Sequence, residues 1–351
     1  MKELKGKKVF VGLSGGVDSA TTAALLVRAG AQVTGVFIKG WYPPDMPCTW
    51  AADRRDAMRV AARLHIPFHT LDGSAAYKRG VIDYLLAEYA AGRTPNPDVM
   101  CNREVKFGIF AEFAFAHGAD FIATGHYARV ARAGEAGARL MCGADPAKDQ
   151  SYFLWAVPQE VLARTLFPLG DLRKQEVRAL ARKFDLPVSE KKDSQGVCFL
   201  GDVSVEEFLR AEFHPELGRA VDEAGREVGM HSGAVLHTLG ERVALSDATP
   251  GPWYVVAKHM EENELVVSHK RAPATPARAA IALRECNWLL APESATAAQY
   301  RYHGPLVSGC IIASGGGYVF EPAEPFPEPP APGQSLVAYA GERCVGGGIM
   351  E

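Results

Sequence analysis

The residues with the clearest chemical potential lie near the start of the chain, where Ser14–Ser19 read SGGVDS between a strand-like run and an apolar helical run. Gly15 and Gly16 permit tight backbone conformations and the close approach of a ligand, and the first N–H groups of the helix would face an anion. No lysine follows the glycines, so the loop lacks the Walker pattern of γ-phosphoryl transfer. It favours a nucleotide that leaves as pyrophosphate. A structural turn in which Ser14 or Asp18 caps the helix is the alternative.

Two cysteines lie in segments rich in cations. Cys101 follows Asp98 in GRTPNPDVMCNREVKFG, where two prolines stiffen the loop around Asn96 and a helix is expected to open at Asn102. Cys198 follows two lysines in SEKKDSQGVCFLG. Nearby cations and a helix N-terminus lower the pKa of a thiol, so both are expected to have thiolate character. Such a pair could carry sulfur, one as a persulfide and the other as the resolving thiol; taken alone, Cys101 is equally compatible with a buried loop cysteine.

The elements that must position these residues alternate between strand and helix up to about residue 125. This alternation predicts a parallel sheet covered by helices on both faces, and such sheets bind ligands beyond the carboxyl ends of their strands. Ser14–Ser19, Lys39–Trp41 and Thr124–His126 all fall at those ends. After Gly201 the chain changes to short β-rich runs separated by turns, including GAVLHTLG at 233–240, which predict small barrels or sandwiches.

The fold class is therefore an α/β N-terminal domain with a parallel sheet, followed by two small mainly-β domains. Expected domains span 1–202, the α/β domain that carries the SGGVDS loop, 203–273, a small β-rich domain, and 274–351, a barrel-like domain.

Composition excludes several classes of protein. The chain has 351 residues, of which 48% are hydrophobic. A chain of this length is too long for one typical hydrophobic core, so more than one domain is expected. The N-terminus has no signal-peptide core and no run reaches membrane-spanning length, so we expect a cytoplasmic protein, and we expect a monomer. Seven cysteines are scattered singly without zinc spacing, which predicts reduced thiols and no metal centre built from protein ligands. The net charge is −3, but residues 173–192 hold seven basic and three acidic residues, so a basic face remains possible.

Taken together, the motifs resemble a known family. SGGxDS is the signature of the N-type ATP pyrophosphatases. With ATGHYAR (123–129), KDQSYFLWAVPQ (148–159) and the two cysteine segments, the chain is similar to the bacterial tRNA-specific 2-thiouridylases. The resemblance covers most of residues 8–202 and resumes in fragments to the C-terminus. It implies an N-terminal domain like the adenine nucleotide alpha hydrolases, with ATP and Mg²⁺ as cofactors.

The resemblance also implies a reaction. ATP adenylylates the C2 oxygen of the wobble uridine in tRNAs for Glu, Gln and Lys, which turns a poor leaving group into a good one. A persulfide on Cys198, loaded by a sulfur-relay donor protein, then delivers sulfur to C2. Cys101 releases it and a Cys101–Cys198 disulfide remains until reduction. Asp98 acts as the acid/base or positioning group at the base, which must be turned out of the anticodon stack.

The resemblance places contacts residue by residue. Nucleotide contacts fall on Gly12, Leu13, Ser14, Gly15, Gly16, Val17, Asp18, Ser19, Ile38 and Gly125, with Asp18 holding Mg²⁺ or the nucleotide. Contacts with tRNA fall on Asn96, Pro97, Asp98, His126, Lys148, Asp149, Gln150, Arg301, Tyr302 and Gln334. A structural role competes evenly for His126, and Tyr152, Phe153 and Trp155 are better explained as core. The basic run 173–192 fits either a solvated helix face or contact with tRNA phosphates.

One segment departs from the family pattern. Residues 236–247 read LHTLGERVALSD where the family shows a stretch like YTIGQRKGLG, so Glu241 replaces a glutamine and a cation is lost. This change is expected to weaken phosphate contact there. Two other functions stay open: an adenylylating ligase that uses ammonia, although no glutaminase segment is visible, and a tRNA-binding protein that has lost catalysis.

Overall fold

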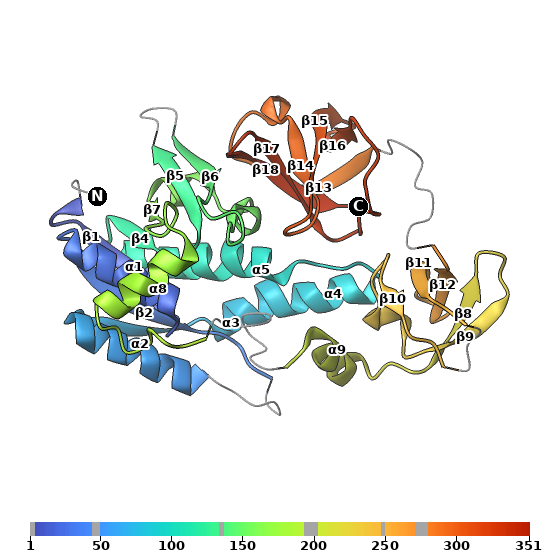
Figure 1. Ribbon diagram of the computed structural model, residues 1–351, viewed down its shortest axis with the longest axis horizontal. Helices are drawn as coiled ribbons and strands as arrows, with labels where there is room; N and C mark the ends of the chain where they lie inside the picture. The colour runs from blue at the N-terminus through green and yellow to red at the C-terminus, as the bar shows by residue number, and fades with distance from the viewer. Residues whose placement is uncertain (1–3, 44–49, 133–136, 193–202, 247–249, 271–279) are drawn as a thin grey trace.

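A computed structural model describes residues 4–43, 50–132, 137–192, 203–246, 250–270 and 280–351. Three bodies follow one another along the chain: an α/β layer structure, a small β-sheet and a β-barrel (Figure 1). The expected boundaries near residues 202 and 274 both lie outside the described residues, so the exact limits of the domains stay a prediction. No helix of the described residues is long and apolar enough to cross a bilayer.

The N-terminal body is built on a five-stranded sheet with the order β3-β2-β1-β4-β7. Every pairing in it is parallel, as the alternation of strand and helix predicts. The first strand runs in the middle, so the loop that follows it lies where the chain crosses from one half of the sheet to the other. The strands are β1 (Lys8–Gly12), β2 (Gln32–Lys39), β3 (Phe68–Asp72), β4 (Phe121–Ala123) and β7 (Thr165–Leu166).

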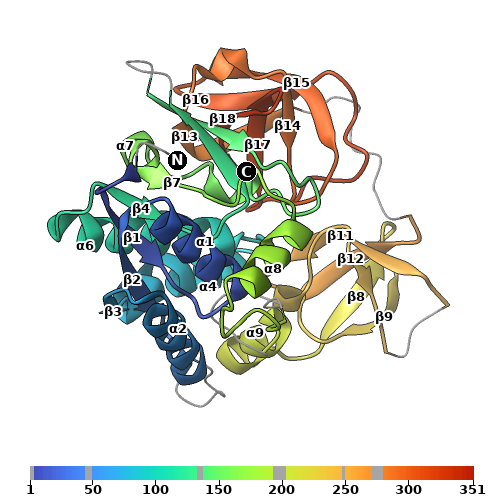
Figure 2. The same ribbon diagram turned by 60° about the vertical axis from the view of Figure 1, so that its left-hand side comes forward.

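Helices cover both faces of this sheet. Successive side chains of β1 point to opposite sides and are apolar on both, so each face needs a covering layer. Val9 and Val11 belong to one core cluster with α1 (Val17–Arg28), α2 (Trp50–Leu64) and α8 (Lys174–Lys183). Phe10 belongs to a second cluster with the helices that follow β3. Figure 2 shows α1, α2 and α8 on one side of the strands. The second group comprises α3 (Ser74–Tyr77), the π-helical η2 (Lys78–Asp83), α4 (Tyr84–Ala90), α5 (Pro97–Met100), the π-helical η3 (Cys101–Ile109) and α6 (Phe110–Ala116).

The central body holds α9 (Val205–Phe213) and a sheet with the order β10-β11-β12-β8-β9. The expected β-rich run at 233–240 is wrong: Ala234–Leu236 form a short 3₁₀ helix, η6. Val235 is buried in the same cluster as Tyr89 of α4, whereas Ala234 lies in the core of the central body, so the run faces two cores instead of alternating across a strand. The strands are β8 (Gly218–Asp222), β9 (Glu227–His231), β10 (Arg242–Val243), β11 (Trp253–His259) and β12 (Glu264–Ser268).

The C-terminal body is a closed barrel, since its first strand β13 pairs with its last strand β18. A hairpin of the N-terminal body, β5 (Ala128–Arg132) and β6 (Ala138–Cys142), extends the same sheet where Met141 pairs with Arg343. The barrel confirms the expected architecture; the added hairpin was not expected. The barrel strands are β13 (Ile281–Trp288), β14 (Ala297–Gln299), β15 (Leu306–Ser314), β16 (Gly317–Pro322), β17 (Ser335–Ala340) and β18 (Arg343–Met350). Short helices are η5 (Ser151–Leu154), α7 (Gln159–Ala163) and η7 (Pro292–Ser294).

Candidate active site

The SGGVDS loop joins the end of β1 to α1 by a turn that only glycine fits. Gly15 has a φ of 78°, in the left-handed region. A Cβ atom at Gly15 would lie 2.3 Å from the backbone oxygen of Asp53 in α2. The missing side chain therefore allows α2 to lie directly against the loop.

The capping alternative for this loop is wrong. Gly16 is the N-cap of α1, and no side chain of the described residues caps it. The two serines instead bond to each other: their Oγ atoms are 3.1 Å apart, and the Ser14 N–H donates to Ser19 Oγ at 3.2 Å. The hydroxyls thus hold the turn closed while the first turn of α1 keeps its anion-binding character.

Asp18, in the first turn of α1, is held by residues from two distant segments. Lys174 Nζ donates to both carboxylate oxygens at 2.7 and 2.8 Å, and Tyr127 Oη donates to Oδ1 at 2.9 Å. The Lys174 side chain is 13% exposed and that of Asp18 is 33% exposed. The loop therefore carries its own cation, supplied from α8.

A second lysine of the basic run also reaches the loop. Lys191 Nζ donates to the backbone oxygen of Gly15 at 3.2 Å and to the carboxylates of Asp53 and Asp56 at 2.9 and 2.8 Å. Burial disfavours the ammonium, but its hydrogen bonds to the two carboxylates outweigh that effect and raise the pKa of Lys191. Neither lysine was assigned to the loop from the sequence. The available signal was the basic run 173–192, and two of its residues turn towards the nucleotide loop.

The other expected nucleotide residues surround the same turn. Leu13 and Val17 are buried in the core, so they can reach a nucleotide only through their backbone. Gly12 and Ile38 are half-buried at the ends of β1 and β2. Gly125 follows β4 and lies so close to α1 that a Cβ atom there would be 2.9 Å from the Ser19 nitrogen. The structure brings these residues together at one end of the sheet.

The loop that precedes Cys101 is capped differently from the expectation. The helix opens at Pro97, the first position of α5, and Asn96 Oδ1 accepts the Val99 N–H at 3.4 Å. Asn102 is therefore not the start of a helix; it lies inside the π-helical η3, where its Nδ2 donates to the Phe153 carbonyl at 3.0 Å. A proline at the first helical position and an asparagine before it form a standard helix start, which fixes Asp98 in the first turn.

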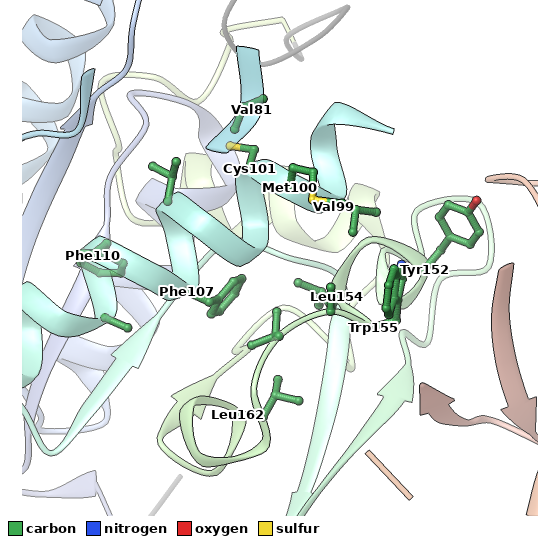
Figure 3. Packing of buried hydrophobic residues seen from close by; sticks show 14 of the residues in the cluster. Val81, Val99, Met100, Cys101, Phe107, Phe110, Tyr152, Leu154, Trp155 and Leu162 are labelled. Atoms are coloured by element: carbon green, nitrogen blue, oxygen red, sulfur yellow. The ribbon is translucent and has the colours of Figure 1, made fainter. Parts of the chain in front are cut away.

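Cys101 is the first residue of η3 and is 3% exposed. It lies in an apolar cluster with Val81 and Met100 (Figure 3). The cation-rich sequence around it therefore does not place the thiol at the surface. Cys198 lies outside the described residues, so the expected pairing of Cys101 with Cys198 stays a prediction.

Comparisons with known proteins place the whole chain. Three family models match it: a tRNA methyl transferase HUP domain over residues 7–202, a tRNA methyl transferase PRC-barrel domain over 206–269 and an aminomethyltransferase beta-barrel domain over 278–350. The tRNA-specific 2-thiouridylase MnmA of Hahella chejuensis is 42% identical over 364 residues, covering 100% of this chain and 99% of that protein. The one of Pseudomonas syringae pv. syringae is 42% identical, covering 98% and 94%.

The chain belongs to the tRNA-specific 2-thiouridylase family. A solved structure, a 4-thiouridine synthetase–RNA complex with bound ATP, is also similar, with 17% identity, a TM-score of 0.36 and coverage of 56% of this chain and 46% of that one. At that TM-score the likeness bears on nothing further.

In this 2-thiouridylase, the C-terminal barrel supports the loop that carries Asn96, Pro97 and Asp98. Gln334 Nε2 donates to the carbonyls of Thr94 at 2.8 Å and Pro95 at 3.2 Å. The Thr94 N–H donates to the Pro332 carbonyl at 2.9 Å. We name residues 94–98 the base loop and this set of contacts the barrel brace. Gln334, expected to contact tRNA, thus makes internal bonds that shape the base loop.

Tyr302 brings the barrel to the same place. Its ring centre lies 4.3 Å from that of Phe153 and 6.0 Å from that of Tyr152. Burial, followed by the nearby carboxylates of Asp149 and Asp98, raises the pKa of Tyr302. Tyr302 therefore lies within electrostatic range of both acids. The expected tRNA residues 98, 149 and 302 form one neighbourhood, although up to two hundred residues separate them in the chain.

Two of the remaining expected tRNA residues have strong internal roles. Asp149 accepts the N–H groups of Gly143 and Ser151 at 2.8 and 3.1 Å, and its other oxygen accepts the Ser151 hydroxyl at 2.9 Å. Gln150 Oε1 accepts the Tyr127 N–H at 3.0 Å. These side chains hold the 148–150 turn in shape. Lys148 is half-buried in that turn, and Arg301 forms an ion pair with Glu328.

His126 is a core residue in this structure. It is 8% exposed, its Nδ1 lies 2.7 Å from Thr124 Oγ1, and its ring packs against those of Phe107 and Phe167. Burial, assisted by the nearby Lys106, lowers the pKa of His126 well below its usual value. A neutral imidazole held this way favours the structural role. The core role expected of Tyr152 and Trp155 agrees with their exposures of 1% and 0%.

In the described part of the divergent segment, residues 236–246, Glu241 has hydrogen-bond partners from the same turn. Glu241 accepts the Thr238 N–H at 2.9 Å and lies 3.3 Å from His237 Nδ1. Thr238 also bonds to Thr94 beside the base loop, with 3.2 Å between the hydroxyl oxygens. Glu241 therefore stabilises a turn that packs on the catalytic body, a role that the loss of a cation in the sequence did not indicate.

Proposed function

We propose that the protein makes 2-thiouridine at the wobble position of tRNA, by adenylylation of the C2 oxygen with ATP and transfer of sulfur from a cysteine persulfide. The observation that carries the proposal is the joint presence of a pyrophosphate-type loop and a braced base loop in a chain that is 42% identical to tRNA-specific 2-thiouridylases over its full length. Tyr127 also connects the SGGVDS loop to the 148–150 turn, because its hydroxyl bonds to Asp18 and its backbone N–H bonds to Gln150.

The first half-reaction uses the SGGVDS loop. The uracil O2 attacks the α-phosphorus, a P–O bond forms, the α–β P–O bond breaks, and its electron pair leaves with pyrophosphate while the N3 proton is lost. The nucleotide contacts proposed are Gly12, Leu13, Ser14, Gly15, Gly16, Val17, Asp18, Ser19, Ile38 and Gly125. The Asp18 carboxylate suits Mg²⁺, which binds one or two carboxylates together with phosphate oxygens and screens their charge.

The second half-reaction uses sulfur and its roles rest on the family resemblance. A persulfide on Cys198 attacks C2, a C–S bond forms and AMP leaves. The Cys101 thiolate then attacks the Cys198 sulfur, the S–S bond of the persulfide breaks with its electron pair on the transferred sulfur, and a Cys101–Cys198 disulfide forms. An external thiol reductant restores both cysteines. Asp98, in the first turn of α5, would position the base or move its proton.

The partners follow from the same proposal. The substrates would be tRNAs for Glu, Gln and Lys, and a sulfur-relay protein would load Cys198. We propose a monomer that works in the cytoplasm, where tRNA is found. The proposed tRNA contacts remain Asn96, Pro97, Asp98, His126, Lys148, Asp149, Gln150, Arg301, Tyr302 and Gln334. The internal bonds of His126, Asp149, Gln150 and Gln334 indicate that these four act mainly by shaping the surface that meets the RNA.

The test is thiolation of an unmodified tRNA transcript with ATP, Mg²⁺ and a persulfide donor, followed by mass analysis of its nucleosides. We expect an oxygen-to-sulfur exchange on one uridine, lost in Cys198→Ser and Cys101→Ser. The exposed Cys310 of the barrel provides the control, since Cys310→Ser should keep full activity. Incorporation of nitrogen from ammonia, or tRNA binding with no modified uridine, would contradict the proposal and favour one of the two other functions.

A further inference from the structure

We propose that Lys174 is a catalytic residue: it exchanges its bond with Asp18 for the phosphate oxygens of ATP and stabilises the departing pyrophosphate. This inference deepens the proposed adenylylation and rests on it for its place in the reaction. It starts from an absence in the motif, because SGGVDS has no lysine where a Walker loop supplies one. A leaving group with several negative charges still requires a cation near it.

The structure supplies that cation from 156 residues away. Lys174 Nζ lies 2.7 and 2.8 Å from the two oxygens of Asp18, and Asp18 is part of the loop itself. The lysine is held at both ends, because its backbone N–H donates to Asp145 Oδ2 at 3.0 Å and its Nζ lies 5.8 Å from the centre of the Tyr127 ring. Figure 2 shows α8 beside α1, as the shared core cluster of the two helices requires. The ammonium is thus fixed at the mouth of the loop.

The position of Lys174 is electrostatically unusual for a purely structural residue. It is the first residue of α8, and Asp18 lies in the first turn of α1, so the ammonium lies near two helix N-termini. Helix N-termini carry partial positive charge, and a lysine there is disfavoured unless an anion is present. Asp18 supplies one negative charge in this structure. The site thus combines a lysine, two helix N-termini and a glycine turn. This combination suits an anion of higher charge than one carboxylate, such as pyrophosphate.

Lys191 has a different role at the same loop. Its ammonium is shared between two carboxylates of α2, Asp53 and Asp56, and the backbone oxygen of Gly15. It therefore ties the glycine turn to α2 and fixes the direction of the backbone. Lys174 differs because its carboxylate partner belongs to the loop, at the position where Mg²⁺ would bind. If Asp18 held Mg²⁺, Lys174 would lose its carboxylate partner and could donate to a phosphate oxygen from the same position.

In the reaction, Lys174 forms and breaks no covalent bond. The uracil O2–phosphorus bond forms and the α–β P–O bond breaks, with the electron pair retained by pyrophosphate. The Lys174 N–H groups donate to the oxygens on which that charge develops. Loss of one such donor typically lowers kcat about 10²–10³-fold.

Direct binding tests the role without any turnover. The full-length protein is titrated with inorganic pyrophosphate plus Mg²⁺, and separately with AMP. We expect Lys174→Met to raise the Kd for pyrophosphate at least about 10-fold, which is the lower end of the range for loss of a hydrogen bond to a charged group. The Kd for AMP should change by no more than about twofold. Lys174→Arg should recover most of the pyrophosphate affinity. Equal weakening of AMP and pyrophosphate, or no change in either, would overturn the proposal.

Kinetics with tRNA complete the test. Pyrophosphate release at saturating tRNA should fall in Lys174→Met, while the affinity for tRNA stays at the wild-type value. Lys183→Met is the matched control, since Lys183 is an exposed lysine of the same helix. If both variants lose tRNA affinity and neither loses pyrophosphate affinity, α8 binds RNA and the proposal fails. A wild-type protein that binds pyrophosphate but does not thiolate tRNA would instead contradict the proposed function alone.

Discussion

The barrel brace leads to a sharp prediction for Gln334→Ala. This substitution removes the donor that bonds to the carbonyls of Thr94 at 2.8 Å and Pro95 at 3.2 Å. Two neutral hydrogen bonds of about 0.5–1.5 kcal/mol each give a loss of about 1–3 kcal/mol in the stability of the braced base loop. That loss lowers the population of the braced conformation roughly 5- to 150-fold relative to its alternatives. Asp98 and the base would then meet in the wrong geometry, so the single-turnover rate of adenylylation should fall by a similar factor.

The assay separates positioning from binding. Single-turnover pyrophosphate release is measured at saturating tRNA, and tRNA affinity is measured by filter binding. A positioning role predicts a slower rate with an unchanged Kd for tRNA. Gln159→Ala is the matched control, because Gln159 Nε2 also donates to a backbone carbonyl, that of Ala138 at 2.6 Å, but far from the base loop in the hairpin β5–β6. The control should lose stability without losing rate. A Gln334→Ala protein with weaker tRNA binding and a normal rate would refute the reasoning and make Gln334 a simple RNA contact.

Three further predictions concern other parts of the molecule. Gly15→Ala should abolish ATP binding, measured by calorimetry, because the new Cβ would lie 2.3 Å from the Asp53 carbonyl oxygen; a normal ATP affinity would show that α2 can move aside. Arg284→Met should cost about 1–3 kcal/mol in chemical denaturation, since Arg284 donates to the buried Glu88 at 2.6 Å, whereas Arg210→Met, which breaks an exposed pair, should cost about 0.3–0.5 kcal/mol; equal costs would contradict this. Burial and the neighbouring His237 lower the pKa of His231 from 6.5 to about 4 in the folded protein. As the pH falls below about 6.5, His231 is protonated in the unfolded chain but not in the folded one. The free energy of unfolding therefore decreases between about pH 6.5 and pH 4. His231→Asn keeps an acceptor for the Gly233 N–H and should make the denaturation midpoint depend less on pH over that range. An unchanged pH dependence would show that His231 is not its source.

The sequence predicted what is local and missed what is distant. SGGVDS could be assigned because a strand, a glycine turn and a helix are consecutive, and the structure keeps that order. Lys174 was not assigned to the loop, because no local pattern shows that a helix start 156 residues away lies on Asp18. Cys101 was expected near a helix start and thiolate-like, whereas it is 3% exposed and lies in an apolar cluster with Val81 of η2 (Figure 3). The barrel brace was missed for the same reason, since it joins residues about 240 positions apart.

The helix start at Asn96 shows a different limit. Asn96 followed by Pro97 is a recognisable start, but Asn102 was expected to open the helix, six residues too late. Turn chemistry alone would have corrected this.

The hairpin β5–β6 pairs with β18 of the barrel, and the buried Trp155 of the catalytic body lies so close to Gly347 of β18 that a Cβ atom there would be 3.1 Å from the indole. The N-terminal body therefore depends on the barrel to cover a strand edge and a buried tryptophan. A protein cut after residue 270 would present an unpaired strand edge and an uncovered indole to solvent, which favours association between copies. Dissection into separately expressed pieces is consequently a poor route to the adenylylation step.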